Sequence, residues 1–142
     1  LLLPGMTEGI SGKGIIRREG KDVTIVGISY MVIEVIRAAE ILEKEGCEVE
    51  IIDPRTLKPL DEKTIINSVN KTGRCLIINE APRFLNYSSE IISIINEKCF
   101  KNLKNRDYRV TGIDTIMPMP KHEQYYLPSK ARIKFAIEKV MS

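Results

Sequence analysis

Short apolar runs alternate with longer amphipathic stretches along this chain. The short runs are rich in Val and Ile, and two of them, 23–28 and 74–79, are apolar almost throughout, which is typical of strands covered on both faces of a sheet. The first run is only partly apolar and predicts a short strand at the edge. Five strands are predicted in all: 13–18, 23–28, 49–53, 74–79 and 108–113.

Between these runs, apolar residues recur every three or four positions, the spacing that gives a helix one buried face. Ser29, Asp61, Ser88 and Ser129 stand where N-caps are expected, and Gly46 stands where a left-handed residue is expected after a helix. Because strands and helices alternate, the pattern predicts a three-layer α/β sandwich with mostly parallel strands. The predicted helices are 30–45, 61–71, 89–100 and 128–140, and 114–128 is predicted to be a long loop.

The first residues differ from the rest of the chain. Residues 1–12 contain Pro4 and three glycines with little periodicity, so they are predicted to be a linker from a missing N-terminal domain. The chain begins with Leu rather than Met, which favours a piece of a longer protein. The remaining residues, 13–142, are expected to form one domain around one core, since 43% of the 142 residues are hydrophobic.

The composition limits the classes of binding partner and the cellular compartments that are expected for this chain. The net charge is +3 and the basic residues are interleaved with acids, so neither nucleic acid nor a membrane surface is indicated. No apolar run approaches the roughly 20 residues that a membrane span needs. Cys47, Cys75 and Cys99 lack disulfide or metal-binding spacing. They are predicted to be small buried residues in a reducing intracellular compartment, whether cytoplasm, mitochondrial matrix or plastid.

Charged residues follow several strands, at the edge where open α/β sheets usually place binding sites. These residues can tie neighbouring loops together, since Asp53 and Glu80 have Arg55 and Arg83 nearby in sequence as possible partners. A metal site is the alternative, but the sequence shows no ligand pattern for it. The candidate carboxylates are Asp53, Asp61, Glu80 and Asp114.

The residues alone indicate no self-sufficient catalytic set. The lone histidine, His122, lies in a predicted loop without Ser, Cys or Asp at a diagnostic spacing. Gly27 is a single glycine where the dinucleotide fingerprint needs three. The pattern therefore favours an α/β domain without catalytic, cofactor-binding or metal-binding residues of its own.

Several segments, in order along almost the whole chain, resemble one family. They are 12–13, 18–26 (REGKDVTIV), 52–61 (IDPRTLKPLD), 64–65, 68–69, 71–72, 80–82 (EAP), 110–112, 114–115 and 127–128. Together they are similar to the C-terminal, transketolase-like domain of the beta subunit of 2-oxo acid dehydrogenases of the pyruvate and branched-chain types. The resemblance implies a five-stranded mixed sheet in which 13–18 runs against the other strands.

The resemblance also implies a division of labour within a parent enzyme. That enzyme oxidatively decarboxylates a 2-oxo acid and transfers the acyl group to lipoamide. Its thiamine diphosphate and Mg²⁺ lie between the alpha subunit and the N-terminal domain of the beta subunit, so this domain alone is expected to bind neither and to be inactive. The implied partners are the alpha subunit, a second beta subunit and the lipoyl-bearing acyltransferase core. Residues expected at subunit or loop contacts are Asp53, Arg55, Glu80 and Asp114.

The chain departs from the family where the acyltransferase core would dock. Family members tend to carry an acid in the loop after the third predicted helix, and this chain has Lys104 there. Like charges facing each other weaken a contact, so Glu97 and Asp107 are the alternative docking residues. A second departure is the segment 83–89, which replaces a glycine pair with larger side chains.

Three questions stay open at the level of sequence. The segments 80–82 and 99–103 resemble branched-chain members slightly more than pyruvate members. Another transketolase-like thiamine enzyme is an alternative parent. A non-catalytic protein-interaction module is the alternative from a different functional class.

Overall fold

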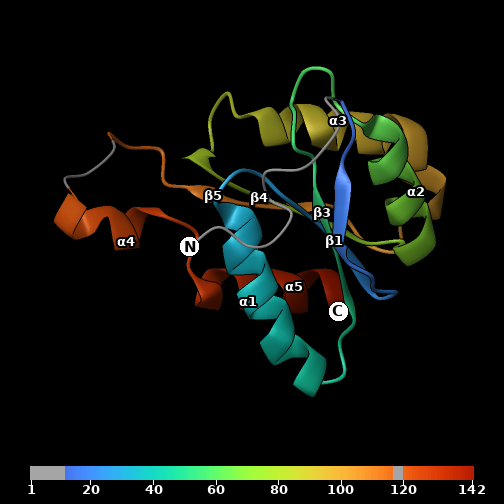
Figure 1. The fold of residues 1–142 in the computed structure, drawn as a ribbon, viewed down its shortest axis with the longest axis horizontal. Coiled ribbons are helices and arrows are strands. Elements are labelled where there is room, and N and C mark those ends of the chain that lie inside the picture. Colours follow the sequence, from blue (N-terminus) through green and yellow to red (C-terminus); the bar gives the residue numbers. More distant parts are fainter. Residues whose placement is uncertain (1–11, 117–119) are drawn as a thin grey trace.

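The computed structural model describes residues 12–116 and 120–142 (Figure 1). Its five-stranded sheet has the order β1-β3-β2-β4-β5, with β1 antiparallel to β3 and every other pair of neighbours parallel. This confirms the predicted mixed, mostly parallel sheet. The predicted linker 1–12 lies outside the described residues except for Gly12. The strands are β1 (Ile15–Arg18), β2 (Val23–Gly27), β3 (Val49–Asp53), β4 (Cys75–Pro82) and β5 (Tyr108–Gly112).

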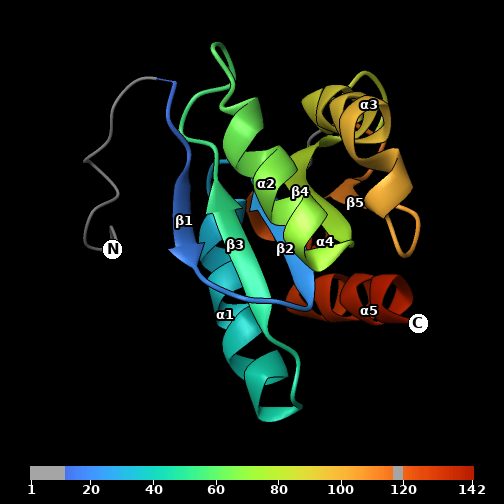
Figure 2. The ribbon, with the colours of Figure 1, turned by 90° about the vertical axis from the view of Figure 1, so that its right-hand side faces the viewer.

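Helices cover both faces of the sheet, so the predicted three-layer sandwich is confirmed (Figures 1 and 2). α1 and α5 share a buried cluster on one face, and α2 and α3 share a second cluster on the other. None of the helices in the described part of the chain is long and apolar enough to cross a membrane. The helices are α1 (Met31–Lys44), α2 (Glu62–Thr72), α3 (Tyr87–Cys99), α4 (Glu123–Tyr126) and α5 (Lys130–Met141), with 3₁₀ turns η1 (Phe100–Asn102) and η2 (Pro120–His122).

Strand β2 lies at the centre of the sheet, and this position explains why its sequence is continuously apolar. All five of its residues are buried. Val23 and Ile25 pack in the cluster with α1 and α5, while Val26 packs in the cluster with α2 and α3. Because successive side chains point to opposite faces, a strand between two helical layers needs apolar residues at nearly every position.

Two of the predicted helix caps are confirmed and two are wrong. The Asp61 carboxylate accepts from the Thr64 amide at 3.2 Å, and the Ser129 hydroxyl accepts from the Arg132 amide at 3.3 Å. Ser29 does not cap α1, because its left-handed backbone (φ +59°) lacks the extended conformation of a capping residue. Ser88 lies inside α3, whose cap is Asn86 in an extended conformation.

The predicted loop 114–128 is corrected at its C-terminal end, where η2 and α4 form a short helical segment. Four residues are too few to show a helical period, which is why the sequence pattern missed α4. Tyr126 anchors it: a Cβ added to Gly112 would lie 2.8 Å from the Tyr126 ring, so glycine permits this close packing. Cys75 and Cys99 are buried as predicted, whereas Cys47 is only half-buried.

Asn86 joins the start of α3 to the end of β4. Its Oδ1 accepts from the Ser88 amide and from Nδ2 of Asn79, both at 2.8 Å. Its Nδ2 donates to the Ala81 and Pro82 carbonyls at 3.1 and 2.7 Å. Asn79 and Asn86 are both buried, and within the described residues Asn86 is the partner that satisfies the Asn79 side-chain NH₂ group.

A buried polar cluster links the sheet to α2. The Thr24 hydroxyl lies 2.7 Å from the Ser68 hydroxyl and 2.8 Å from the Thr72 hydroxyl. On β3, Glu50 is 1% exposed and pairs with the ammonium group of Lys71. Burial alone raises the pKa of Glu50, but hydrogen bonds from Lys71 and from the Gly20 amide outweigh it, so the pKa lies below its usual value.

We expect Asn86→Ala to lower the free energy of unfolding by about 2–4 kcal/mol. Losing an N-cap costs about 1 kcal/mol, and leaving the buried Asn79 amide unpaired adds about 1–3 kcal/mol. Urea denaturation measures the change. The matched control is Asn67→Ala, an exposed asparagine of α2, for which we expect about 0.5 kcal/mol or less. Similar losses for both variants would contradict the role of Asn86.

Glu50→Gln tests the buried ion pair through its pH dependence. The folded-state pKa of Glu50 is lowered, so its contribution to stability is present above the unfolded pKa, about 4.3, and is lost as the pH falls through the folded value. We therefore expect the variant to be less stable at pH 7 and the difference to shrink under acid. The exposed Glu40→Gln serves as control. A difference independent of pH would contradict the prediction.

Candidate functional site

Loops from successive parallel strands meet at the carboxyl edge of the sheet, and their backbones are strained. Within residues 12–116 and 120–142, the non-glycine residues with positive φ are Ser29 (+59°), Arg55 (+62°) and Leu85 (+50°). One follows each of β2, β3 and β4, which are neighbours in the sheet. Such conformations cost on the order of 1–3 kcal/mol each and concentrate at functional sites. This edge is therefore the candidate site.

Asp53 holds the β3 end of this edge. Its Oδ2 accepts from Nη2 and Nε of Arg17 at 2.7 and 3.1 Å, and both side chains are largely buried. Its Oδ1 accepts from the Arg55 amide at 3.0 Å, and the Arg55 guanidinium lies 3.6 Å from Oδ2. Arg17 reaches Asp53 from a β-bulge, where the pairing of β1 with β3 shifts between Ile16 and Arg18.

Arg17 is a contact that sequence reasoning missed. Its partner Asp53 lies 36 positions away, and the bulge that brings the two side chains together leaves no local sequence signal. The contact between Asp53 and Arg55 could be predicted from the sequence because the two residues are only two positions apart. Asp53 and Arg55 line an open hollow of about 340 Å³, together with Ser29 and Leu57.

Asp61, the N-cap of α2, connects the loop after β3 to the residues just before β1. Its Oδ2 accepts from the Gly14 amide at 3.0 Å and from the Thr64 hydroxyl at 2.8 Å. Burial opposes ionisation of this carboxyl, but these hydrogen bonds outweigh it and hold the pKa of Asp61 below its usual value. The group is therefore a charged anchor at neutral pH.

Side chains also join the loops to one another. The Tyr87 hydroxyl donates to the Leu57 carbonyl, which connects the loop after β4 to the loop after β3. Asp114, after β5, accepts from the Phe84 amide at 2.8 Å and so holds the other side of the loop after β4. Glu80 lies half-buried near the end of β4. The loops thus form a connected rim rather than independent segments.

The rim presents large apolar side chains to solvent. Phe84 is 76% exposed and Leu85 is 91% exposed, although the backbone that carries them is fixed by Asp114 and Asn86. Contiguous exposed apolar surface on a soluble fold marks an interaction site more often than a chance feature. Further exposed apolar residues in the same set of loops are Tyr30, Leu57, Ile113 and Ile116.

The three predicted docking residues lie away from this rim, near the amino edge of the sheet. Lys104 donates its amide to the Gly73 carbonyl at 2.8 Å, and its side chain lies over Gly73. Asp107 accepts weakly from the Asn96 side chain, at 3.4 and 3.5 Å. Glu97 is exposed on α3. The structure therefore separates the predicted contact residues from the predicted docking residues.

The chemistry available at the rim is that of a binding surface. In residues 12–116 and 120–142, no three His, Cys, Asp or Glu residues gather closely enough to hold a metal ion. Three of the four candidate carboxylates fix loops: Asp53 contacts arginines, Asp61 accepts from Gly14 and Thr64, and Asp114 accepts from the Phe84 amide. Within the described residues, Glu80 makes no ion pair with Arg83 or any other residue. Beside Glu80, the rim offers mainly apolar surface on a rigid frame.

Comparison with known proteins gives a consistent picture. Residues 12–133 match the model of the transketolase C-terminal domain. The chain is 40% identical over 129 residues to the pyruvate dehydrogenase E1 component subunit beta of Acholeplasma laidlawii, covering 91% of this chain and 39% of that protein. The corresponding subunit of Staphylococcus aureus is 40% identical over 119 residues, covering 84% of this chain and 37% of that protein.

A solved structure agrees with the sequence relatives. A split-gene transketolase, described as an inactive beta4 tetramer, superposes with a TM-score of 0.80 at 25% identity, over 94% of this chain and 42% of that chain. The chain thus spans well under half the length of the proteins it matches. By the match to the family model and by these relatives, this chain belongs to the transketolase C-terminal domain family.

Proposed function

We propose that this chain is the C-terminal assembly domain of the beta subunit of a thiamine-dependent 2-oxo acid dehydrogenase. The parent enzyme would oxidatively decarboxylate a 2-oxo acid and transfer the acyl group to lipoamide in a reducing intracellular compartment. Similarity to two bacterial pyruvate dehydrogenase beta subunits supports this proposal. The names of these relatives favour pyruvate over the branched-chain acids that the segments 80–82 and 99–103 suggested.

The proposal places thiamine diphosphate and its Mg²⁺ in the rest of the parent protein. A Mg²⁺ ion needs converging oxygen ligands in octahedral geometry, usually including one or two carboxylates. In the part of this chain that the structure describes, the carboxylates are dispersed and Asp53 and Asp61 are already engaged. These residues do not fit the cofactor, so no catalytic step is assigned to them.

The rim at the carboxyl edge carries the assembly role. Contacts of Asp53, Asn86 and Asp114 hold the strained loops that present exposed apolar side chains, and large apolar residues at the centre of an interface dominate its binding free energy. The alpha subunit and a second beta subunit are the partners that this surface would contact.

Docking of the acyltransferase core belongs to the amino edge in this proposal. Lys104 is exposed there, held in place by the contact with Gly73. Glu97 on α3 and Asp107 just before β5 supply negative charge in the same region. A partner surface matched to this mixed charge would bind more weakly as salt is raised.

Replacing one aromatic residue of the rim tests the assembly role. In the full-length protein that carries this domain, we expect Phe84→Ala to weaken subunit association about tenfold or more, the effect typical of a central apolar anchor. Analytical ultracentrifugation measures it. Phe100→Ala is the matched control, since Phe100 is 72% exposed but lies at the end of α3, by the amino edge. Equal effects of the two substitutions would refute the proposal.

The Arg55→Ala substitution tests whether Arg55 serves subunit assembly or the catalytic reaction. Arg55 lies at the rim and contacts Asp53, so we expect weaker assembly. At protein concentrations high enough for full assembly, we expect turnover within about twofold of the wild type, because a lost interface contact changes association rather than the chemical step. The control is Arg37→Ala, an exposed arginine of α1 that pairs with Glu34. Loss of turnover in the fully assembled enzyme would show that Arg55 serves catalysis.

A further inference from the structure

Within the described residues, strand β5 forms one end of the sheet and pairs with a single strand, β4. The Thr111 carbonyl accepts from Nη2 of Arg132 at 2.7 Å, so this carbonyl points away from β4. Backbone groups alternate in direction along a strand, and those of Arg109, two residues earlier, therefore point outward as well. Such an edge can pair with a strand from another chain.

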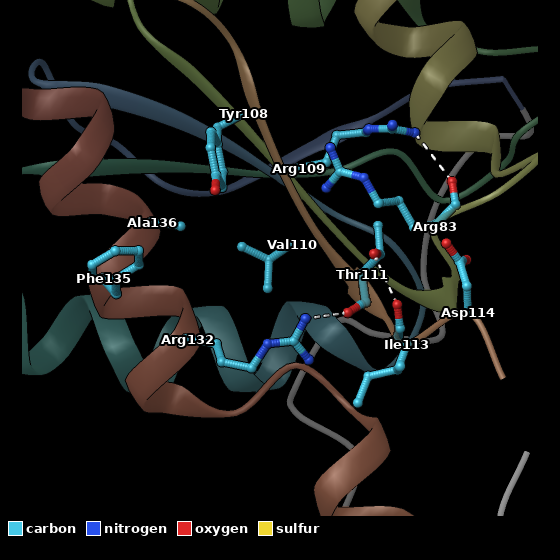
Figure 3. A pocket seen from close by; sticks show the side chains of 11 residues that line it. Arg83, Tyr108, Arg109, Val110, Thr111, Ile113, Asp114, Arg132, Phe135 and Ala136 are labelled. Atoms are coloured by element: carbon cyan, nitrogen blue, oxygen red, sulfur yellow. Dashed lines mark hydrogen bonds between the residues drawn. The ribbon is translucent and has the colours of Figure 1, made fainter.

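A groove runs along this edge. Two adjoining hollows, of about 510 and 330 Å³, share Arg83, Tyr108 and Arg109 as lining residues. Figure 3 shows Arg83 and Arg109 on one side of β5, and Arg132 and Phe135 of α5 on the other. Five residues of strand extend about 16 Å, so the groove has the shape for an extended segment rather than a compact ligand.

The groove is basic, and two of its arginines, Arg109 and Arg132, are held by neutral groups. Arg109 donates to the Arg83 carbonyl at 3.3 Å and to the Ser89 hydroxyl. Within the described residues, neither these arginines nor Arg106 and Arg132, which also line the groove, lie within ion-pair distance of a carboxylate. By contrast, the arginines elsewhere that pair with carboxylates are Arg17, Arg18, Arg37 and Arg55.

Two acids also line the groove, Asp107 and Asp114. Their hydrogen bonds from the Asn96 side chain and the Phe84 amide leave both carboxylates negative, so four arginines with two carboxylates give the groove an excess of two positive charges. The apolar side of the groove is formed by Phe135, which is 55% exposed, together with Tyr108 and Val110. The groove thus has Arg83 and Arg109 on one side of the strand edge, and Phe135 with Arg132 on the other, where Nζ of Lys139 lies 5.5 Å from the centroid of the Phe135 ring.

We propose that this groove binds an extended acidic segment of another protein, which adds as a strand beside β5. Successive side chains of a strand point to opposite faces. Acidic residues at alternate positions would therefore meet Arg83 and Arg109, while the apolar residues between them would pack against Phe135. Backbone hydrogen bonds to β5 supply affinity in this mode of recognition, and the side-chain contacts supply specificity.

A second copy of this chain fits the groove poorly. If β5 of one copy paired with β5 of another in the register that places Arg109 opposite Arg109, the two guanidinium groups would face each other, and like charges facing each other across paired strands are destabilising. In any register, two copies of the groove would bring an excess of positive charge together. The occupant is therefore a different chain of opposite charge. This inference concerns binding alone and does not depend on the activity of the parent enzyme.

The test uses the full-length protein that carries this domain and a short fluorescent peptide of alternating Glu and Val residues, with binding followed by anisotropy. We expect Arg83→Glu to weaken binding about tenfold or more, because one charge contact is lost and a repulsion is added. Arg37→Glu, on α1, is the control and should leave binding unchanged. Arg83 is exposed and its side chain makes no hydrogen bond within the described residues, so folding is expected to survive; circular dichroism checks this.

Three altered peptides complete the test: one with Gln in place of Glu, and two N-methylated on alternate backbone amides, in the two possible registers. The Gln peptide lacks the charges, and one of the two N-methylated peptides lacks the amides that face β5, so we expect each of these to bind at least about tenfold more weakly. Unchanged binding of the Gln peptide would overturn the electrostatic part of the proposal. Unchanged binding of both N-methylated registers would overturn strand addition. Self-association that Arg83→Glu strengthens, without peptide binding, would assign the groove to a second copy instead.

Discussion

Burial of the central strand between two helical layers constrains everything else in this domain. β2 is covered by α1 and α5 on one face and by α2 on the other, and it pairs with β3 and β4 at its two edges. A strand held on four sides allows no shift in register, because a slip of one residue would exchange its two sets of apolar side chains. The parallel neighbours are thereby aligned, and their carboxyl ends meet at one edge of the sheet.

That alignment explains how strained loops persist at the rim. Each positive-φ residue follows a strand whose end is fixed, and its loop is held by side chains such as Asp53, Asn86 or Asp114. The free energy of these contacts offsets the backbone strain locally. The result is a surface whose apolar residues are already positioned, which reduces the conformational entropy lost when a partner binds.

Arginines are used in two distinct ways in this molecule. Arg17 makes a largely buried contact with Asp53 and joins β1 to β3, so it contributes to the frame of the sheet. Arg109 is held by a carbonyl and a hydroxyl, which orient the guanidinium without neutralising it. The first arrangement completes the fold, and the second leaves a positive charge directed at solvent beside an unpaired strand edge.

Features that depend on residues close together in the chain could be predicted from the amino-acid sequence. The alternation of strands and helices, the caps at Asp61 and Ser129, and the left-handed Gly46 followed from periodicity and local hydrogen-bonding preferences, and the structure confirms them. The same local reasoning placed helix caps wrongly at Ser29 and Ser88. Ser29 has a left-handed backbone, and Ser88 lies inside α3, whose cap is Asn86. The resemblance to the transketolase C-terminal domain added the antiparallel first strand, which no local pattern specifies.

Contacts between side chains that are far apart in the sequence emerge only in the folded domain. Arg17 reaches Asp53 through a bulge, Tyr87 reaches the Leu57 carbonyl, and Asp114 reaches the Phe84 amide, each across 30 or more positions. The basic groove has the same origin, because its arginines come from the loop after β4, from β5 and its entrance, and from α5. Sequence spacing cannot reveal such contacts, since they depend on strand order and register, which are set by packing of the whole sheet.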